Sequence, residues 1–258
     1  MTEQMKIKML FMLSSILRPL CLVVIALALS GCSSDYQWGW YVVSPVTESG
    51  RINLQFLATG ALYTLGISLL AFTLAMLAGL IIALPGLSSH KPLRAFNRVY
   101  VETFRSIPVL VMILWIYYGL PIVSGIELSA FAAAVIALAI CESAFHAEIF
   151  RGGVNAIGKG QFEAAEALGL NYFQKMYCVI LPQAIRKMIP PLANQFVYML
   201  KMSSLASVIG VQELTRRANE LQISEYRAME IYSILVLEYL VLVLLFSWLA
   251  RKLERKAA

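Results

Sequence analysis

Charge is scarce in this chain of 258 residues: 14% of them are Asp, Glu, Lys or Arg, whereas 60% are hydrophobic and the mean hydropathy is +0.74. An ordinary globular domain carries about 25% charged residues, so this composition excludes a soluble globular class. No charged residue occurs from Ile52 to Ser89, nor from Ser106 to Ile126. A helical membrane span needs about 20 apolar residues, and each stretch therefore predicts one transmembrane helix.

Side chains that bind metals or catalyse reactions are also sparse. The chain has two histidines and four cysteines, and none of them joins a carboxylate set at metal-ligand spacing. His146 follows Glu142 by four residues, which favours a hydrogen-bonded pair on one helical face over a metal site. No Ser, His and carboxylate grouping indicates a hydrolase. We therefore expect no catalytic residue, no metal and no cofactor bound by this chain.

One short segment imitates a nucleotide-binding loop. Gly153 to Lys159 fits the first seven positions of a P-loop, but Gly160 stands where a Ser or Thr should hold magnesium. The segment also follows an apolar helix, whereas a P-loop follows a buried strand. The sequence therefore argues against ATP binding by this chain and against an enzyme.

Three further apolar stretches, each interrupted by ionisable residues, bring the predicted core spans to five. They run from Leu128 to Phe150, from Ile189 to Val211 and from Ile231 to Ala250. The predicted fold class is an all-α membrane protein. A single transmembrane domain over residues 54–250 is followed by a basic tail, residues 251–258.

Positive charge is distributed unevenly between the predicted loops, and Lys and Arg are retained on the cytoplasmic side of short loops. Thirteen share one side: Lys91, Arg94, Arg98, Arg105, Arg151, Lys159, Lys175, Arg186, Lys187, Arg251, Lys252, Arg255 and Lys256. The other side has Arg51, Arg216, Arg217 and Arg227. The first core helix is therefore predicted to enter from outside, with the C-terminus in the cytoplasm. The net charge of +6 then reflects topology rather than nucleic-acid binding.

The N-terminal segment, residues 1–33, has two interpretations. Lys6, Lys8 and Arg18 precede an apolar run from Leu20 to Leu29, and Leu29-Ser30-Gly31-Cys32 matches a lipoprotein cleavage box. As a signal, the segment would be cut before Cys32; as an anchor, it would form a sixth helix. The anchor is favoured because so short a match arises easily in a helix rich in Leu, Ala and Ser. The lipoprotein interpretation would allow a lipid-anchored scaffold or signalling protein without transport activity.

A polar, basic loop over residues 151–188 separates the third and fourth predicted spans. Gly158 and Gly160 precede, and Gly169 follows, the segment Gln161 to Leu168. Glycines in these positions are helix breakers and caps, so this segment predicts a helix of about two turns. Its small Ala side chains would let a partner's groove approach closely, and something soluble is expected to dock there.

This loop resembles the EAA loop of permease subunits in ABC importers, E-A-A-x3-G-x9-I-x-L-P, with Val179 in place of Ile. Other segments resemble the polar amino-acid subfamily of these permeases: Glu102 to Pro108, Tyr117 to Pro121, Ala147 to Gly153, Gly160 to Ala165, Leu181 to Ala184 and Lys201 to Gly210. The resemblance covers roughly Trp38 to Lys256. Met202 departs from it, since family members usually carry Asp or Asn there, which makes this position less polar than in the family.

The resemblance implies a type I ABC importer permease fold, with five core transmembrane helices plus the N-terminal leader or anchor helix. It implies a multi-pass protein of the bacterial inner membrane that translocates a polar amino acid. The implied partners are two ATP-binding cassette subunits that hydrolyse ATP, an extracytoplasmic substrate-binding protein, a second permease chain that is identical or paralogous, and membrane lipid. The implied ATPase-coupling residues are Gly160, Glu163, Ala164, Ala165, Gly169, Leu181 and Pro182.

Three ionisable residues interrupt the apolar segments: Glu142, Lys201 and Glu238. Such groups usually line a bundle interior because burial in lipid is costly, so together with Ser204 they are predicted to line a translocation pathway. Lys201 is twelve residues beyond Ile189, or roughly 18 Å into the membrane at about 1.5 Å per residue. An amino acid could place its carboxylate near Lys201 and its ammonium near Glu142. Alternatively, Lys201 only neutralises Glu142 or Glu238.

Overall fold

The computed structural model describes residues 36–257, and the described residues from Trp40 onward form one compact unit. The N-terminal segment 1–33, with the question of cleavage at Cys32, lies outside the described residues. The α-helices are α2 (Glu48–Leu87), α3 (Lys91–Ser106), α4 (Val109–Leu114), α5 (Leu120–Ser124), α6 (Ala130–Asn155), α7 (Lys159–Ala167), α8 (Tyr172–Gln174), α9 (Leu181–Met202), α10 (Leu214–Glu225) and α11 (Ala228–Ala257). Four tighter or wider turns connect them: the 3-10 helices η1 (Trp40–Val43) and η4 (Ser203–Ile209), and the π-helices η2 (Trp115–Gly119) and η3 (Lys175–Ile180).

The described residues include three helices that are long and apolar enough to cross a membrane, namely α2, α6 and α11. The pair formed by α3 and the segment Val109–Ser124 gives a fourth if it counts as one span, although it is bent by 94°. The bend lies at Ile107, the second residue of the predicted second span, which takes an extended conformation (φ −84°, ψ 124°). Pro108 follows it, and a residue before proline is sterically excluded from the helical region. The predicted span therefore corresponds to Val109–Ser124, and the charged helix α3 precedes it.

The predicted fourth span, Ile189 to Val211, is shifted in the structure. Helix α9 begins earlier, at Leu181, and ends at Met202, where the 3-10 helix η4 continues the chain. Pro190 and Pro191 lie inside α9; proline lacks an N–H, so each leaves a gap in the ladder of intrahelical hydrogen bonds. Together α8, η3 and α9 form one uninterrupted helical segment from Tyr172 to Met202.

Small residues determine how the central helices pack. Helices α2 and α6 lie against each other, and Ala71 and Ala75 of α2 and Ala137 of α6 are fully buried. Gly79 has no room for a side chain, because an added Cβ would lie 2.6 Å from Cβ of His146. Small interfacial residues let membrane helices approach closely, which increases dispersion contacts where lipid removes the hydrophobic driving force.

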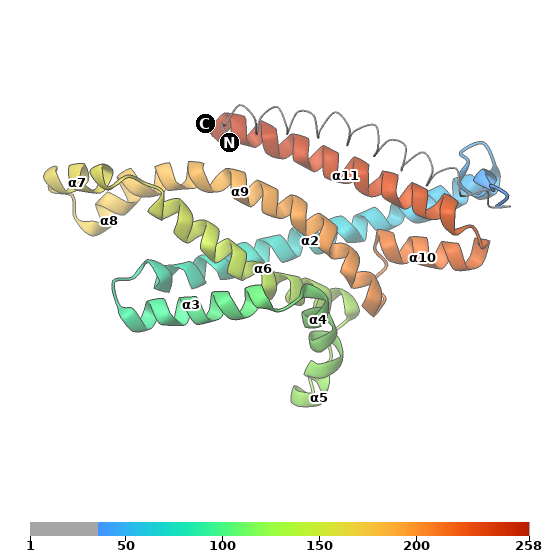
Figure 1. The fold of residues 1–258 in the computed structure, drawn as a ribbon, viewed down its shortest axis with the longest axis horizontal. Coiled ribbons are helices and arrows are strands. Elements are labelled where there is room, and N and C mark those ends of the chain that lie inside the picture. The colour runs from blue at the N-terminus through green and yellow to red at the C-terminus, as the bar shows by residue number, and fades with distance from the viewer. Residues whose placement is uncertain (1–35, 258) are drawn as a thin grey trace, which may run out of the picture. The chain divides into compact units, whose positions relative to one another are not determined.

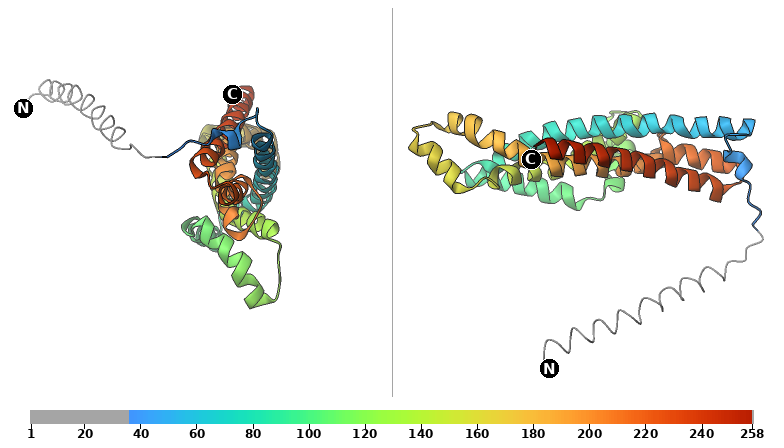
Figure 2. Two further views of the ribbon diagram at one scale, coloured as in Figure 1. Left: turned by 90° about the vertical axis from the view of Figure 1, so that its right-hand side faces the viewer. Right: turned by 90° about the horizontal axis from the view of Figure 1, so that it is seen from above.

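The two ends of this unit differ in their elements (Figures 1 and 2). One end is formed by η1, the start of α2, α10 and the start of α11. Asn53 of α2 donates to Oε1 of Glu225 at 2.9 Å, and the Arg217 guanidinium lies 4.4 Å from the Phe56 ring centroid. The opposite end carries α7, α8 and the start of α3. The four arginines that were predicted to lie on the opposite side from the basic loop are Arg51, Arg216, Arg217 and Arg227. In the structure they lie at one end of the unit and the basic loop lies at the other, which confirms their separation.

Candidate functional site

The predicted helix of the polar loop is confirmed: α7 runs from Lys159 to Ala167, two residues earlier at its start than expected. Gly158 is the N-cap, and Gly160 lies exposed inside the first turn. Ala165 is 2% exposed and packs inward, whereas Glu163 and Ala164 face outward. The helix therefore presents a carboxylate and a small residue on an open face that a partner can contact.

Gly169 ends this helix in the left-handed conformation, with φ +73°. Its N–H donates to the Glu166 carbonyl oxygen at 2.9 Å, and the Leu170 N–H donates to the Ala165 carbonyl oxygen at 3.1 Å. These two bonds form a Schellman cap, for which glycine is the preferred residue because it has no Cβ to clash. The predicted role of Gly169 as a cap is confirmed.

Helix α7 is held against the start of α9. The half-buried Phe162 packs on the apolar cluster around Ile180 and Ala184. Gln183 donates from Nε2 to Oε1 of Gln161 at 3.1 Å. Leu181 is half-buried, and Pro182 is exposed where α9 continues from the π-helix η3. Because proline lacks an N–H, Pro182 leaves a gap in the ladder of hydrogen bonds at this junction.

Sequence reasoning missed the apolar side chains beside α7. Leu168 is 78% exposed, Tyr172 62%, Phe173 81% and Tyr177 77%. Asn171 and Gln174 form a capping box that starts α8 and projects two of these aromatics outward. Together with Glu163 and Ala164, these four residues are here called the docking surface. The available signal was Asn171 followed three residues later by Gln174, a pattern that marks a helix start.

A buried polar cluster lies where α6 meets α9. Glu142 is fully buried, and Gln195 donates from Nε2 to its Oε2. His146 bonds the backbone carbonyl oxygen of Glu142 through Nδ1 at 2.8 Å, so the predicted pair is joined through the backbone rather than the carboxylate. Within residues 36–257, Oε1 of Glu142 and Nε2 of His146 have no hydrogen-bond partner. Two buried polar atoms are thus left for another donor or acceptor.

The alternative in which Lys201 neutralises Glu142 or Glu238 is contradicted by the structure. Lys201 is exposed near the end of α9 and shares a pocket of about 470 Å³ with Ser204 and Tyr239. Glu238 lines a different pocket, and no ion pair in the described part of the chain joins Lys201 to either carboxylate. The physical reason is the early start of α9, which moves Lys201 to the far end of that helix, beyond Gln195.

Comparison with known proteins agrees with this architecture. Residues 75–258 match the family described as the inner membrane component of binding-protein-dependent transport systems. The glutamine transport system permease protein GlnP of Escherichia coli K12 is 37% identical over 226 residues, which cover 85% of this chain and 98% of that protein. A putative glutamine transport system permease protein GlnP of Rickettsia conorii is 36% identical over 201 residues, covering 78% and 92%.

Solved structures of ABC transporters also resemble this chain. The crystal structure of an amino acid ABC transporter with histidines superposes with a TM-score of 0.76 and 43% sequence identity, covering 81% of this chain and 97% of that chain. An inward-facing MetNI methionine ABC transporter superposes with a TM-score of 0.68 at 21% identity, covering 80% and 97%; at this identity it supports the fold alone. The fold is that of type I ABC importer permeases. The chain belongs to the family of inner membrane components of binding-protein-dependent transport systems.

Proposed function

We propose that this chain is the permease subunit for a polar amino acid, delivered by a substrate-binding protein and moved at the expense of ATP. ATP is hydrolysed by a separate subunit. The observation that carries the proposal is the docking surface, because an exposed helix with a fixed cap and four exposed apolar side chains fits a protein partner. The similarity to glutamine permeases and to an amino acid ABC transporter supports the substrate class.

The docking surface is the proposed contact for the ATP-binding subunit. Glu163 and Ala164 face outward on α7, while Ala165 anchors the helix to the bundle. Gly169 fixes the direction in which the chain leaves α7. Movement of the partner would therefore be transmitted through α7 to α9, because Gln161 and Gln183 connect the two helices.

The proposed assembly contains two permease chains, identical or paralogous, and two ATP-binding subunits in the bacterial cytoplasmic membrane. Within residues 36–257, only 6% of the apolar window of α11 is buried, so apolar side chains on much of this helix are exposed. Such a surface must meet lipid or a second permease chain. We infer that a second permease chain completes the translocation pathway together with this one.

The buried polar cluster is the proposed contact for the ammonium group of the substrate, as predicted for Glu142. Oε1 of Glu142 is buried and without a partner among the described residues, and it can accept a hydrogen bond from an ammonium group. Lys201 and Ser204 line an open pocket instead, and Glu238 lines another; they remain proposed pathway residues on separate sides of α11.

Co-purification tests the docking step. Glu163→Lys should insert normally into the membrane but lose the ATP-binding subunit, because it reverses the charge of the one carboxylate among the residues of the docking surface. Glu127→Lys is the matched control, since Glu127 is also exposed but lies in the loop before α6. Equal recovery of the ATP-binding subunit with both variants would contradict the proposed surface.

Uptake tests the substrate class. Vesicles that contain the permease, the ATP-binding subunit and the binding protein should accumulate polar amino acids, with ATP hydrolysis stimulated by substrate and binding protein together. A panel of single labelled amino acids identifies the substrate. Substrate-independent ATP hydrolysis without uptake would favour a scaffold without transport activity.

A further inference from the structure

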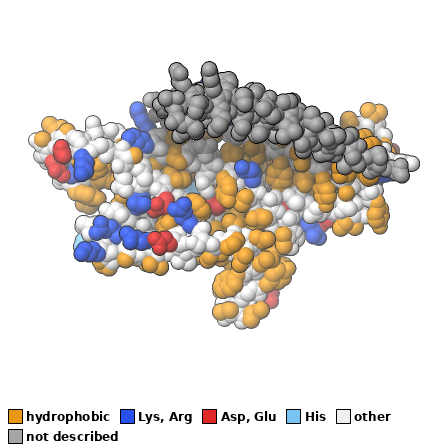
Figure 3. Space-filling model, in the orientation of Figure 1, with side chains coloured by type: hydrophobic (Ala, Val, Ile, Leu, Met, Phe, Trp, Pro, Cys, Tyr) orange, Lys and Arg blue, Asp and Glu red, His pale blue; other side chains and the backbone are white. Residues whose placement is uncertain are grey.

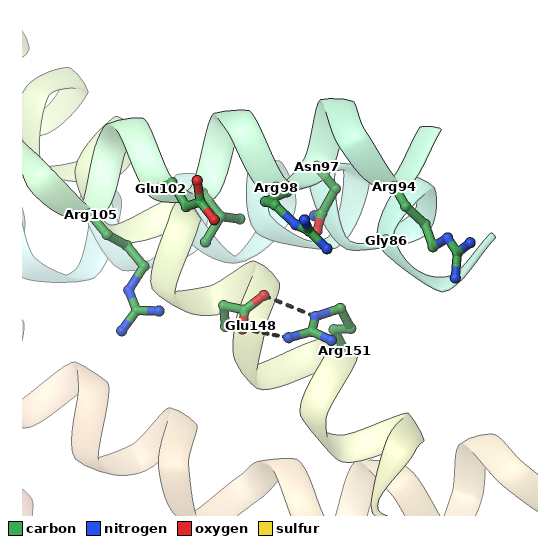
Figure 4. A pocket seen from close by; sticks show the side chains of 9 residues that line it. Gly86, Arg94, Asn97, Arg98, Glu102, Arg105, Glu148 and Arg151 are labelled. Atoms are coloured by element: carbon green, nitrogen blue, oxygen red, sulfur yellow. Dashed lines mark hydrogen bonds and ion pairs between the residues drawn. The ribbon is translucent and has the colours of Figure 1, made fainter. Parts of the chain in front are cut away.

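An arginine-rich pocket of about 250 Å³ lies between α3 and α6, apart from both the docking surface and the buried polar cluster (Figure 4). Its charged lining residues are Arg94, Arg98, Glu102, Arg105, Glu148 and Arg151. Four arginines and two glutamates leave a formal excess of two positive charges. An excess of this kind in a concave site attracts anions.

The glutamates do not neutralise this pocket. Glu148 is occupied by a bidentate contact, in which Arg151 donates from Nε at 2.9 Å and from Nη2 at 2.7 Å. Within residues 36–257, no ion pair joins Arg94, Arg98 or Arg105 to a carboxylate. These three residues recur at spacings of four and seven, so their guanidinium groups lie along one face of α3. The Arg105 guanidinium also lies 4.9 Å from the Phe145 ring centroid. Since no carboxylate among the described residues holds any of the three guanidinium groups, their N–H donors can bind a ligand.

Tertiary contacts of α3 with α2 and α6 hold the arginine side chains at this pocket. Asn97 donates from Nδ2 to the Ile82 carbonyl oxygen at 2.7 Å, and Gly86 allows this approach, since an added Cβ would lie 2.7 Å from Oδ1 of Asn97. Tyr100 and Ser143 are joined through their hydroxyl oxygens at 2.8 Å. These contacts fix the rotation of α3 about its axis, and thereby direct its arginine face at α6.

The other exposed side chains of α3 suit a membrane surface. Leu93 is 45% exposed, Phe96 55% and Val99 64%, so α3 combines a basic face with an apolar one. Figure 3 shows basic side chains gathered over α3 and the adjoining end of the unit. This is the end that the positive-inside rule places in the cytoplasm, where anionic lipid headgroups lie.

We propose that this pocket binds a phosphate group, and that the headgroup of an anionic phospholipid supplies it. Guanidinium forks match the paired oxygens of a phosphate, and basic pockets between membrane helices are known to hold such headgroups. The apolar face of α3 lies in the same helix, so acyl chains and headgroup are contacted together. The site needs no substrate and is independent of the proposed transport function.

Lipid binding by the full chain, purified in detergent, tests the proposal. Cardiolipin, phosphatidylcholine and inorganic phosphate are titrated separately, and binding is measured by native mass spectrometry and by the shift in unfolding temperature. Arg98→Gln and Arg105→Gln should each weaken cardiolipin binding about fivefold, as expected for one basic residue near a charged membrane surface. Lys91→Gln is the matched control, because Lys91 is exposed on the same helix but does not line the pocket.

A variant that is expected to bind cardiolipin more strongly serves as a control, because a misfolded protein would bind it more weakly. Glu102 is exposed and lines the pocket, so Glu102→Gln raises the positive excess and should strengthen cardiolipin binding. Preference for cardiolipin over phosphatidylcholine supports the lipid source, whereas binding of inorganic phosphate alone overturns that source. Equal weakening by Lys91→Gln and Arg98→Gln, or no gain from Glu102→Gln, overturns the site. Because transport is not measured, failure of the permease proposal would leave these results unchanged.

Discussion

Gly160 and Gly169, which lie in the first turn and just after the end of α7, differ in backbone conformation but both have room for a side chain. Neither Gly160 nor Gly169 has an atom within 4 Å of an added Cβ, yet only Gly169 has a positive φ. Gly169→Ala should therefore destabilise the end of α7 by about 1–2 kcal/mol, whereas Gly160→Ala should stabilise the helix by up to about 1 kcal/mol. Hydrogen exchange of the Gly169 and Leu170 amides measures this difference. Similar protection in both variants would contradict the role of the cap.

Recovery of the ATP-binding subunit with the same two variants distinguishes a loss of helix structure from a loss of direct contact with that subunit. Gly160→Ala preserves the fold of α7, so any loss of the ATP-binding subunit in that variant reports a direct contact at Gly160. Gly169→Ala should reduce both cap protection and recovery of the subunit. Gly152→Ala, another helical position with open space, is the control outside the docking surface.

The partners of Glu142 and Lys201 lead to a second prediction at the scale of single residues. Glu142→Leu strands the Gln195 amide, which should lower stability by about 1–3 kcal/mol, whereas Glu142→Gln keeps an acceptor for it. Lys201→Met should leave stability nearly unchanged, because Lys201 is exposed and forms no ion pair with either carboxylate. Thermal unfolding in detergent compares the three variants. A large loss in Lys201→Met would show that its carboxylate partner exists after all.

At the scale of helices, the contact between α2 and α6 depends on Gly79. Gly79→Ala should destabilise the bundle by about 1–3 kcal/mol, because the added methyl group overpacks a filled interface. The methyl carbon would lie 2.6 Å from Cβ of His146 and 2.9 Å from the carbonyl oxygen of Ser143. Gly66→Ala is the control on the same helix, since its nearest neighbour would be 3.7 Å away. If the two variants unfold at the same temperature, α2 and α6 are not packed as described.

Much of the helical architecture was predictable because long uncharged runs and isolated glycines carry local signals. The α7 helix followed from Gly158 and Gly169, and the helical class followed from composition. The bend at Ile107 was missed because the charged segment from Lys91 to Arg105 was predicted as a loop, although Pro108 marks the bend. The position of Lys201 was also missed, since polar residues from Leu181 to Lys187 concealed the early start of α9. Contacts between distant residues, such as Gln195 with Glu142, carry no local signal.

At the scale of the whole molecule, the separation of basic residues between the two ends predicts one orientation in the membrane. Ser49 and Lys159 are both exposed, and they lie on α2 and α7 at opposite ends of the unit. In a variant without the four native cysteines, a probe that cannot cross the membrane should label a cysteine at Ser49, but not one at Lys159, in intact cells. Permeabilised cells, in which both should react, provide the control. The reverse pattern would overturn the orientation.

Of the three prolines in α9, Pro182, Pro190 and Pro191, the two inside the helix divide the long helical segment into a lever with unequal arms. At about 1.5 Å per residue, the arm from Tyr172 to Pro190 measures roughly 27 Å, whereas the arm from Pro191 to Gln195 measures roughly 6 Å. If the segment pivots at the prolines, where the hydrogen-bond ladder is interrupted, a swing at the docking surface arrives at Gln195 reduced about fourfold. A large movement at the proposed docking surface would thereby become a small, forceful displacement beside the buried carboxylate of Glu142.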